Sequence, residues 1–340
     1  MTQLLSSHAL CTRLSETVLA TLKPLTAGRN RYGLLDFPEH WNIGDSAIWA
    51  GEIALLNRLF ARGPDHVSHH RHDPNEPGRV LGEDRILFLH GGGNFGDIWT
   101  TYHSYRAAVI RRHPHHRIIQ LPQSIQFNDV SNIEETKRVL GSHPDYHLMV
   151  RDHESYALAT QYFNCPVYLT PDSAFGIDMS QVSRVIQSEG ILGLLRTDKE
   201  ARSDAKEGCR YFEKCLIGDW NKLPKPVVFG DKVMRRLFRS PILGGVQGLR
   251  TAVFNAMATA RVNLGFAQLD RAEVVVTDRL HGHIMSTLLG KPHVVIDNYY
   301  GKIARFIDAF GKDDATLQAS TYAEAREMAD DLLNRIQLLR

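Results

Sequence analysis

Cysteine is scarce in this chain, with four among 340 residues and no Cys-x-x-Cys pair. Such sparse cysteines exclude a disulfide-stapled scaffold and a thiolate zinc module, and they suit a reducing compartment. Long apolar runs are also missing, because no window approaches 18 uninterrupted apolar residues, so no membrane-spanning helix is predicted. The first twenty residues mix charges into their apolar positions and lack the apolar core of a signal peptide. We therefore expect a soluble, cytoplasmic protein.

Charge of one sign is not in excess either. Forty Lys and Arg face 38 Asp and Glu, a formal net charge of +2, so neither nucleic acid nor bulk membrane is an expected partner. The 17 histidines are unusual, because protonating half of them would make the protein strongly basic below about pH 6.5. With 43% hydrophobic residues the chain is too apolar to be disordered, and its length favours two domains.

Short apolar runs alternate with helical patterns, which is typical of parallel βαβ units. The alternation restarts after Phe175, so we predict an α/β protein with two Rossmann-like domains, over residues 1–180 and 181–340. A ligand cleft is expected between the carboxyl ends of their strands. The histidine-rich stretch 66–72 is predicted as a surface loop. The predicted strands are 32–37, 85–90, 117–122, 147–150, 167–169, 191–195, 227–229, 274–277 and 293–297, and the predicted helices 4–22, 47–60, 102–112, 246–263, 281–289, 303–310 and 323–339.

Three consecutive glycines follow the predicted strand at 86–89. Glycines are entropically costly to order, so a purely structural turn rarely needs three, and their N–H groups could form a nest for an anion. Gly92, Gly93 and Asn94 are therefore candidates for substrate binding. Asp97, just beyond, could bind an acceptor hydroxyl or act as a base. Tight packing between strand and helix is the alternative explanation.

Other strand ends of the first domain carry polar side chains that either bind a ligand or cap a helix. Asp45 could hold a sugar hydroxyl, act as a base or cap the helix that follows it. Gln123 and Ser124 suit sugar hydroxyls or phosphate, although a turn explains the serine equally well. Arg151 is the residue of its segment for which binding is favoured over capping. Asp172 lies near the expected cleft, and capping explains it equally well.

The second domain delivers two arginines from predicted strand ends, Arg196 and Arg279. Guanidinium forks match carboxylate and phosphate, so the pair could clamp a small anion. His281 is then placed as a proton donor beside the clamp. An ion pair with Asp278 and a packed histidine are the structural alternative. A metal is not expected, because His281 and His283 point in divergent directions on a helix.

Six segments follow one another along the chain: NIGDSAIWAGEIALL, FLHGGGNFGDIW, LPQSIQF, RDHESY, TPDSAF and VVVTDRLHGHIMSTLLGKPHVVIDNYYGKI. In this order they resemble the polysaccharide pyruvyl transferase family. The resemblance covers residues 31–310 and leaves the charged stretch 199–225 without a match. It implies a GT-B-like fold and transfer of pyruvate from phosphoenolpyruvate onto two sugar hydroxyls, giving a cyclic ketal and phosphate. Arg279 and His281 correspond to the family's Arg-Leu-His motif, while the sequence around Arg196 is less distinctive.

The residues fit the chemistry that the resemblance implies. Arg196 and Arg279 could hold the two anionic ends of phosphoenolpyruvate, and His281 could protonate its enol carbon. Asp97 or Asp45 could then act as the base for the attacking hydroxyl. No metal and no further cofactor are required. The expected partners are phosphoenolpyruvate and a saccharide or lipid-linked oligosaccharide of a surface polymer.

Two other functions stay open at this point. A glycosyltransferase using a nucleotide sugar would need a base and ribose pocket, and no carboxylate after the strand at 191–195 is an obvious ribose ligand. A saccharide-binding scaffold would make Arg279 and His281 structural. The basic stretch Lys232–Arg239 could bring the protein to the inner face of the cytoplasmic membrane, although a solvated helix face explains it as well.

Overall fold

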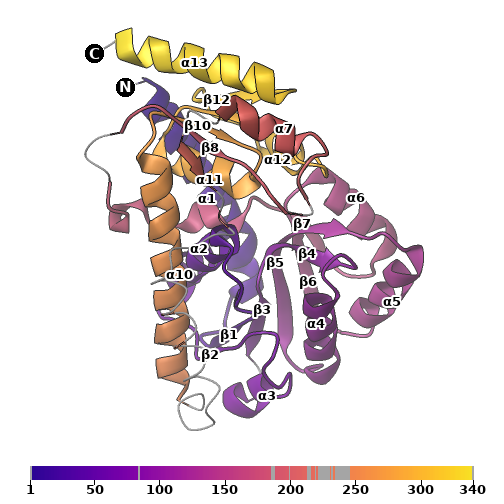
Figure 1. Cartoon of the computed structure of the whole chain (residues 1–340). Helices are drawn as coiled ribbons and strands as arrows, with labels where there is room; N and C mark the ends of the chain where they lie inside the picture. Colours follow the sequence, from indigo (N-terminus) through magenta and orange to yellow (C-terminus); the bar gives the residue numbers. More distant parts are fainter. Residues whose placement is uncertain are drawn as a thin grey trace.

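The computed structural model describes residues 2–82, 85–184, 188–198, 200–212, 216–218, 220, 230, 233 and 246–338. Two parallel sheets with flanking helices make up this part of the chain (Figure 1). The first sheet has the order β2-β1-β3-β5-β6-β7, and β4 pairs with the second half of β5. Its strands are β1 (Tyr32–Leu35), β2 (His66–Val67), β3 (Ile86–Leu89), β4 (Gly92–Gly96), β5 (Arg117–Gln126), β6 (Tyr146–Val150) and β7 (Val167–Leu169).

The second sheet follows in sequence, in the order β12-β11-β10-β8-β9, and all of its pairs are parallel. Every residue of β8, β10 and β11 is buried, as expected for parallel strands covered on both faces. The prediction of an α/β protein with parallel sheets is confirmed. The strands are β8 (Ile191–Leu194), β9 (Leu216–Gly218), β10 (Val274–Thr277), β11 (His293–Ile296) and β12 (Thr316–Ala319).

Two long helices, α1 and α10, pack against both halves of the chain. Leu14 of α1 shares a core cluster with Leu194 of the second sheet, whereas Leu22 packs with Leu34 of the first. Helix α10 runs along the first half in Figure 1 and contributes to both clusters in the same way. The longer helices are α1 (Thr2–Thr26), α2 (Ile43–Phe60), α4 (Thr100–Arg112), α5 (Val130–Gly141), α6 (His153–Tyr162), α10 (Gln247–Asp270), α11 (Leu280–Leu289), α12 (Lys302–Phe310) and α13 (Tyr322–Leu338); the short ones are α3 (Glu76–Leu81), α7 (Ala205–Gly208), η1 (Ser173–Gly176), η2 (Met179–Gln181) and η3 (Cys209–Phe212).

The predicted elements that fall on described residues are present in the structure, which has four further strands. Sequence patterns missed β2, β4, β9 and β12. The prediction of a surface loop at 66–72 is wrong for its first two residues, because they form β2 and His66 is fully buried. The strand predicted at 227–229 lies outside the described residues, as does the basic stretch Lys232–Arg239 apart from Val233.

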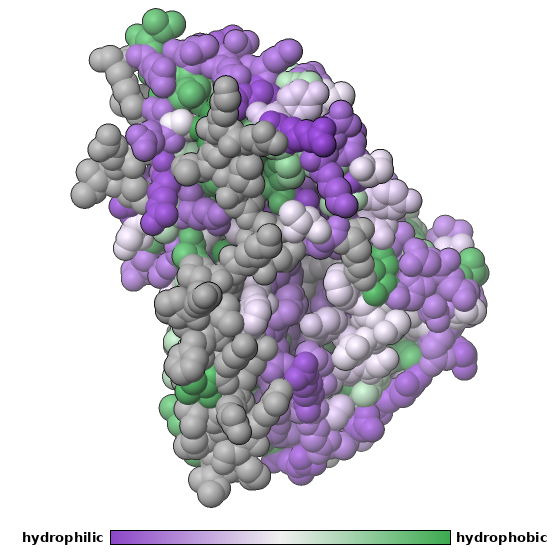
Figure 2. All heavy atoms as spheres, viewed as in Figure 1, coloured by the Kyte–Doolittle hydropathy of each residue, from purple (hydrophilic) through white to green (hydrophobic). Residues whose placement is uncertain are grey.

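Polar side chains dominate the face in Figure 2, where apolar residues form small scattered areas among the coloured atoms. No described helix combines the length and apolar character needed to cross a bilayer.

Candidate active site

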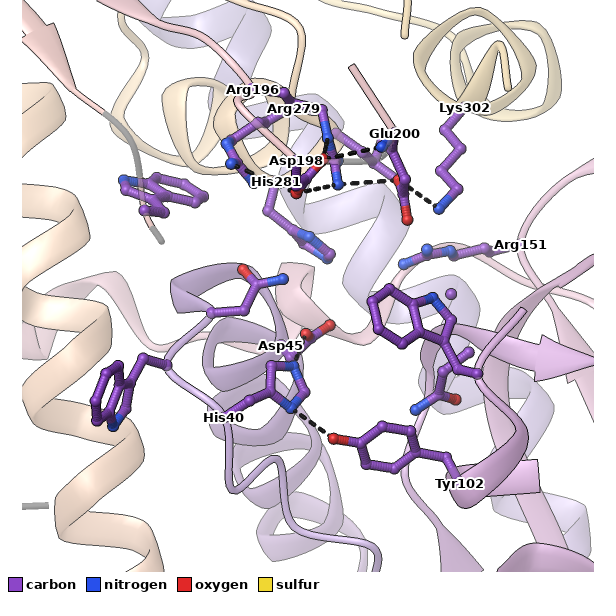
Figure 3. A pocket seen from close by; sticks show the side chains of 17 residues that line it. His40, Asp45, Tyr102, Arg151, Arg196, Asp198, Glu200, Arg279, His281 and Lys302 are labelled. Carbon is purple, nitrogen blue, oxygen red and sulfur yellow. Dashed lines mark hydrogen bonds and ion pairs between the residues drawn. The ribbon is translucent and has the colours of Figure 1, made fainter. Parts of the chain in front are cut away.

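A pocket of about 450 Å³ opens where the strand ends of both sheets meet. Seven of the residues predicted from the sequence line it: Asp45, Gly93, Asn94, Arg151, Arg196, Arg279 and His281. In Figure 3, His281 lies between Arg196, Arg279 and their carboxylate partners on one side and Asp45 with His40 and Tyr102 on the other. The remaining lining residues are His40, Trp41, Asn42, Trp99, Tyr102, Asp198, Glu200, Trp220, Leu280 and Lys302.

Arg196 and Arg279 come from neighbouring strands, since they follow β8 and β10. Arg196 donates through Nε and Nη2 to the two oxygens of Asp198, at 2.9 Å each, and its Nη2 lies 3.0 Å from Glu200. The same Asp198 carboxylate is 3.8 Å from Nη2 of Arg279. These two arginines hold the pKa of Asp198 down at about 2, against its burial, so the carboxylate stays ionised and fixes the guanidinium group of Arg196. Sequence reasoning missed Asp198.

His281 lies in the first turn of α11 and faces the pocket. Its Nε2 is 3.5 Å from Oδ2 of Asp172, which is too long for a good hydrogen bond but places a carboxylate beside the ring. The ring packs directly on Gly44, where an added Cβ would collide with it. This contact explains why the Asn-Ile-Gly-Asp segment has a glycine at position 44, because α2 and the histidine ring approach each other too closely for a side chain there.

Arg151 is almost fully buried at the wall of the pocket. It forms an ion pair with Asp172, and its Nε donates to Ser124 at 3.1 Å. Burial would raise the pKa of Asp172, but Arg151 and His281 hold it well below its usual range. Asp172 also caps η1 by accepting from the Ala174 N–H at 2.8 Å. Ser124 thus positions Arg151 and does not line the pocket.

Lys302 is a pocket residue that sequence reasoning did not single out. It begins α12, after the turn that follows β11, and its Nζ donates to Glu200 at 2.9 Å. Its Nζ lies 3.3 Å from the point where a side chain on Gly93 would begin, and Arg151 lies 3.1 Å from that point. A lysine at the start of the helix that follows a predicted strand was the signal available in the sequence. Burial lowers the pKa of Lys302, which the Glu200 carboxylate opposes.

Asp45 forms the opposite wall with two side chains that were not predicted. Its Oδ2 lies 2.5 Å from Nε2 of His40, whose Nδ1 is 3.1 Å from the Tyr102 hydroxyl. Burial acts to raise the pKa of Asp45, but the bond to His40 and the nearby His281 and His90 lower it well below its usual range. Asn42, and not Asp45, caps α2, because its side chain accepts from the Gly44 N–H. Asp45 is therefore an ionised acceptor facing the pocket.

The glycine segment is strand β4, and part of it reaches the pocket. Gly93 and Asn94 line it, whereas Gly92 lies beneath, with φ +122° and Asp45 Oδ1 3.6 Å from where its Cβ would be. Gln123 does not line the pocket. Its amide donates to the His90 carbonyl and to Asn94 Oδ1, at 3.0 Å each, so Gln123 supports β4 and the residues that lead into it.

Asp97 does not reach the pocket. Its carboxylate accepts from the backbone N–H groups of Asn128 and Asp129 at 2.8–2.9 Å and from Nδ2 of Asn132 at 3.1 Å. Burial opposes ionisation, but these donors lower the pKa of Asp97. The expectation that Asp97 serves as a base is corrected accordingly, since the carboxylate holds the start of α5 in place.

His281 and His283 diverge, as the helical spacing predicted. His283 is buried and its Nδ1 lies 2.8 Å from Nε2 of His293 in the core of the second sheet. The two histidines therefore do not share a ligand.

The pocket lining brings four cationic side chains together with three carboxylates. The cations are Arg151, Arg196, Arg279 and Lys302, and the carboxylates are Asp45, Asp198 and Glu200. The cations gather around Gly93 and the start of α11, while Asp45 stands apart with His40. The arrangement can bind an anion with two charged ends next to a histidine and offers a carboxylate acceptor for a hydroxyl across the pocket.

Comparison with known proteins gives a consistent result. The family model described as polysaccharide pyruvyl transferase matches residues 42–299. EpsO of Bacillus subtilis, provisionally named a pyruvyl transferase, is 29% identical over 86% of this chain and 89% of its own. Pyruvyl transferase 1 of Schizosaccharomyces pombe is 28% identical over 88% of this chain and 75% of its own.

A solved structure of an uncharacterised protein from Klebsiella pneumoniae covers 91% of this chain and 99% of its own. Its TM-score is 0.58 and its sequence identity 18%, so it shows the fold alone. The matched family segment contains most of the residues that line the pocket, including Asp45, Arg196, Arg279 and His281. The chain belongs to the polysaccharide pyruvyl transferase family.

Proposed function

We propose that this protein transfers pyruvate from phosphoenolpyruvate onto two hydroxyls of a saccharide, forming a cyclic ketal and releasing phosphate. The observation that carries the proposal is the juxtaposition of His281 with Arg151, Arg196, Arg279 and Lys302 in one pocket. Phosphoenolpyruvate has a carboxylate and a phosphate, and arginine forks suit both. The pocket thus supports phosphoenolpyruvate as the donor for the transferase activity that the family implies.

The reaction balances with the groups present. His281, carrying a proton, gives it to C3 of phosphoenolpyruvate, which makes C2 an electrophilic centre resembling an oxocarbenium ion. One sugar hydroxyl adds to C2, and the second hydroxyl then displaces phosphate from the same carbon. Of the two hydroxyl protons, one restores His281 and the other leaves with phosphate. No metal, redox step or further cofactor is required.

We assign the acceptor side of the pocket to Asp45. The ionised carboxylate can accept a hydrogen bond from the attacking hydroxyl, and His40 and Tyr102 extend the chain of polar groups behind it. The low pKa of Asp45 makes it a weak base, so its main role is to orient the hydroxyl.

The same proposal covers architecture and location. Residues 1–180 would form the acceptor domain and 181–340 the donor domain of a GT-B-like pair, with the pocket as the cleft between them. The scarcity of cysteine and the phosphorylated donor support a cytoplasmic location. A lipid-linked acceptor at the inner face of the membrane is compatible with this arrangement.

The test is phosphate release from phosphoenolpyruvate with a panel of galactosides, glucosides and mannosides. The wild type should release phosphate only with a suitable sugar, and His281→Ala should lose about 10²–10⁴ in rate. Arg138→Ala, an exposed arginine on α5 with 75% of its side chain accessible, is the matched control and should be unchanged. Wild-type rates in both His281→Ala and Arg279→Ala would refute the mechanism.

A further inference from the structure

A group of side chains that could bind a metal ion adjoins the acceptor wall of the pocket, which is formed by Asp45, His40 and Tyr102. Among the described residues, Glu39, His69 and His70 form the one group of three His, Cys, Asp or Glu side chains whose ligand atoms lie within 4.8 Å of one another. Glu39 directly precedes His40, and the His70 ring is 4.7 Å from that of Tyr102. The group therefore adjoins two residues that line the pocket.

Two of these side chains have buried polar atoms without hydrogen bonds. Oε2 of Glu39 and Nδ1 of His70 make none with the described residues, and Glu39 is only 4% exposed. A buried carboxylate oxygen without a donor is unfavourable unless a cation compensates it. The site is therefore arranged for a positive charge that its present contacts satisfy poorly.

Arg71 supplies the positive charge in this structure. Its Nε lies 3.3 Å from Glu39 Oε2 and 3.4 Å from His70 Nε2, and its backbone N–H is 3.1 Å from His69 Nδ1. These contacts are long for charge-assisted bonds. The Arg71 side chain is 56% exposed, so it can leave the group without crossing the core.

We propose that Glu39, His69 and His70 bind a divalent transition metal of the zinc type, which displaces the Arg71 side chain. Two imidazoles and one carboxylate form a common zinc ligand set, with water as the fourth ligand. Metal bonds of about 2.0–2.2 Å require the ligand atoms to close by roughly 1 Å from their present separations. The metal would fix His70 against Tyr102 and so hold the acceptor wall. This inference does not depend on the proposed reaction.

The experiment measures zinc binding to the full chain, by competition with a chromogenic chelator and by the shift in melting temperature. The wild type should bind one zinc tightly, and Glu39→Gln and His70→Ala should each lower the affinity at least tenfold. Arg71→Ala should raise the affinity on the order of tenfold, because it removes the competing cation. His115→Ala, an exposed histidine outside the group, is the control and should bind as the wild type does.

The outcomes distinguish a specific metal site from adventitious binding and from a permanent ion pair with Arg71. Zinc bound equally well by the wild type, Glu39→Gln and His70→Ala would mean adventitious binding and would overturn the site. Binding by Arg71→Ala alone would mean that Arg71 is the permanent cation, which also overturns it. Melting curves without zinc establish that each variant is folded. Glu39→Gln keeps the shape of the side chain and so provides the test if His70→Ala unfolds.

Discussion

At the scale of single residues, the pocket depends on how closely two chain segments approach each other. Gly44 lies in the first turn of α2 with His281 packed against its α-carbon. The histidine ring is thus held from one side by backbone and from the other by Asp172 at 3.5 Å. Such a ring has little freedom to change its direction, which suits a proton donor that must meet one carbon atom.

Replacing Gly44 by alanine should therefore impair catalysis without unfolding the protein. Alanine favours the helix, but its methyl group would push His281 out of position, and we expect a loss of about tenfold to a hundredfold in kcat. Gly141→Ala is the control, since nothing lies within 4 Å of an added Cβ there. Steady-state kinetics and circular dichroism check both variants. Equal kcat in Gly44→Ala and the wild type would contradict the packing argument.

Residues at strand ends were predictable to the extent that their chemistry is visible in the sequence. Arg196, Arg279 and His281 follow buried strands, so the sequence alone places them at one sheet edge. Asp97 could not be distinguished from a pocket carboxylate, because the helix start that it holds lies about 30 residues further along the chain. Lys302 follows a longer turn, so its approach to Gly93 depends on tertiary packing.

At the scale of elements, most of the predicted strands are buried on both faces, where an apolar run is unambiguous, although β7 is only partly buried. Strand β4 was missed because its glycines indicate a turn, and β12 because its burial is mixed. Helix α1 was predicted, but its double role was not. Its N-terminal half packs on the second sheet and its C-terminal half on the first. An amphipathic pattern does not specify this property, because it depends on tertiary structure.

Helix α1 should therefore be essential to stability, although it lies outside the matched family segment. Leu14 is fully buried among side chains of the second half, and Leu14→Ala should lower the free energy of unfolding by about 2–5 kcal/mol. Leu249→Ala, at a position that is 42% exposed, should change it by less than about 0.5 kcal/mol. Urea denaturation measures both. A similar small effect for the two variants would show that α1 is dispensable.

At the scale of the whole molecule, buried histidines couple the stability of the fold to pH. Burial, together with the charges of His293 and Lys312, lowers the pKa of His283 well below its ordinary value of 6.5. The unfolded chain takes up a proton at this residue as the pH falls below about 6.5, and the folded protein does not. The contribution of His283 to stability is therefore full above that pH and lost progressively below it.

We expect the free energy of unfolding to fall between pH 7 and pH 5, and to fall less steeply in His283→Gln. The difference in slope should approach about 1.4 kcal/mol per pH unit, which corresponds to one proton. Urea denaturation across this range gives both slopes. His115→Gln, at an exposed position, should keep the steeper one. Parallel profiles for His283→Gln and the wild type would exclude this residue as a source of acid sensitivity.

Both halves of the molecule contribute side chains to the pocket, and we propose that its cations bind phosphoenolpyruvate. The most direct measurement is isothermal titration calorimetry with phosphoenolpyruvate alone, which needs no knowledge of the acceptor. We predict saturable binding to the wild type and to Arg138→Ala, weakened about tenfold to a hundredfold in Arg279→Ala and in Lys302→Met. If phosphoenolpyruvate fails to bind while a nucleotide sugar does, the proposed function is wrong and the protein is a glycosyltransferase.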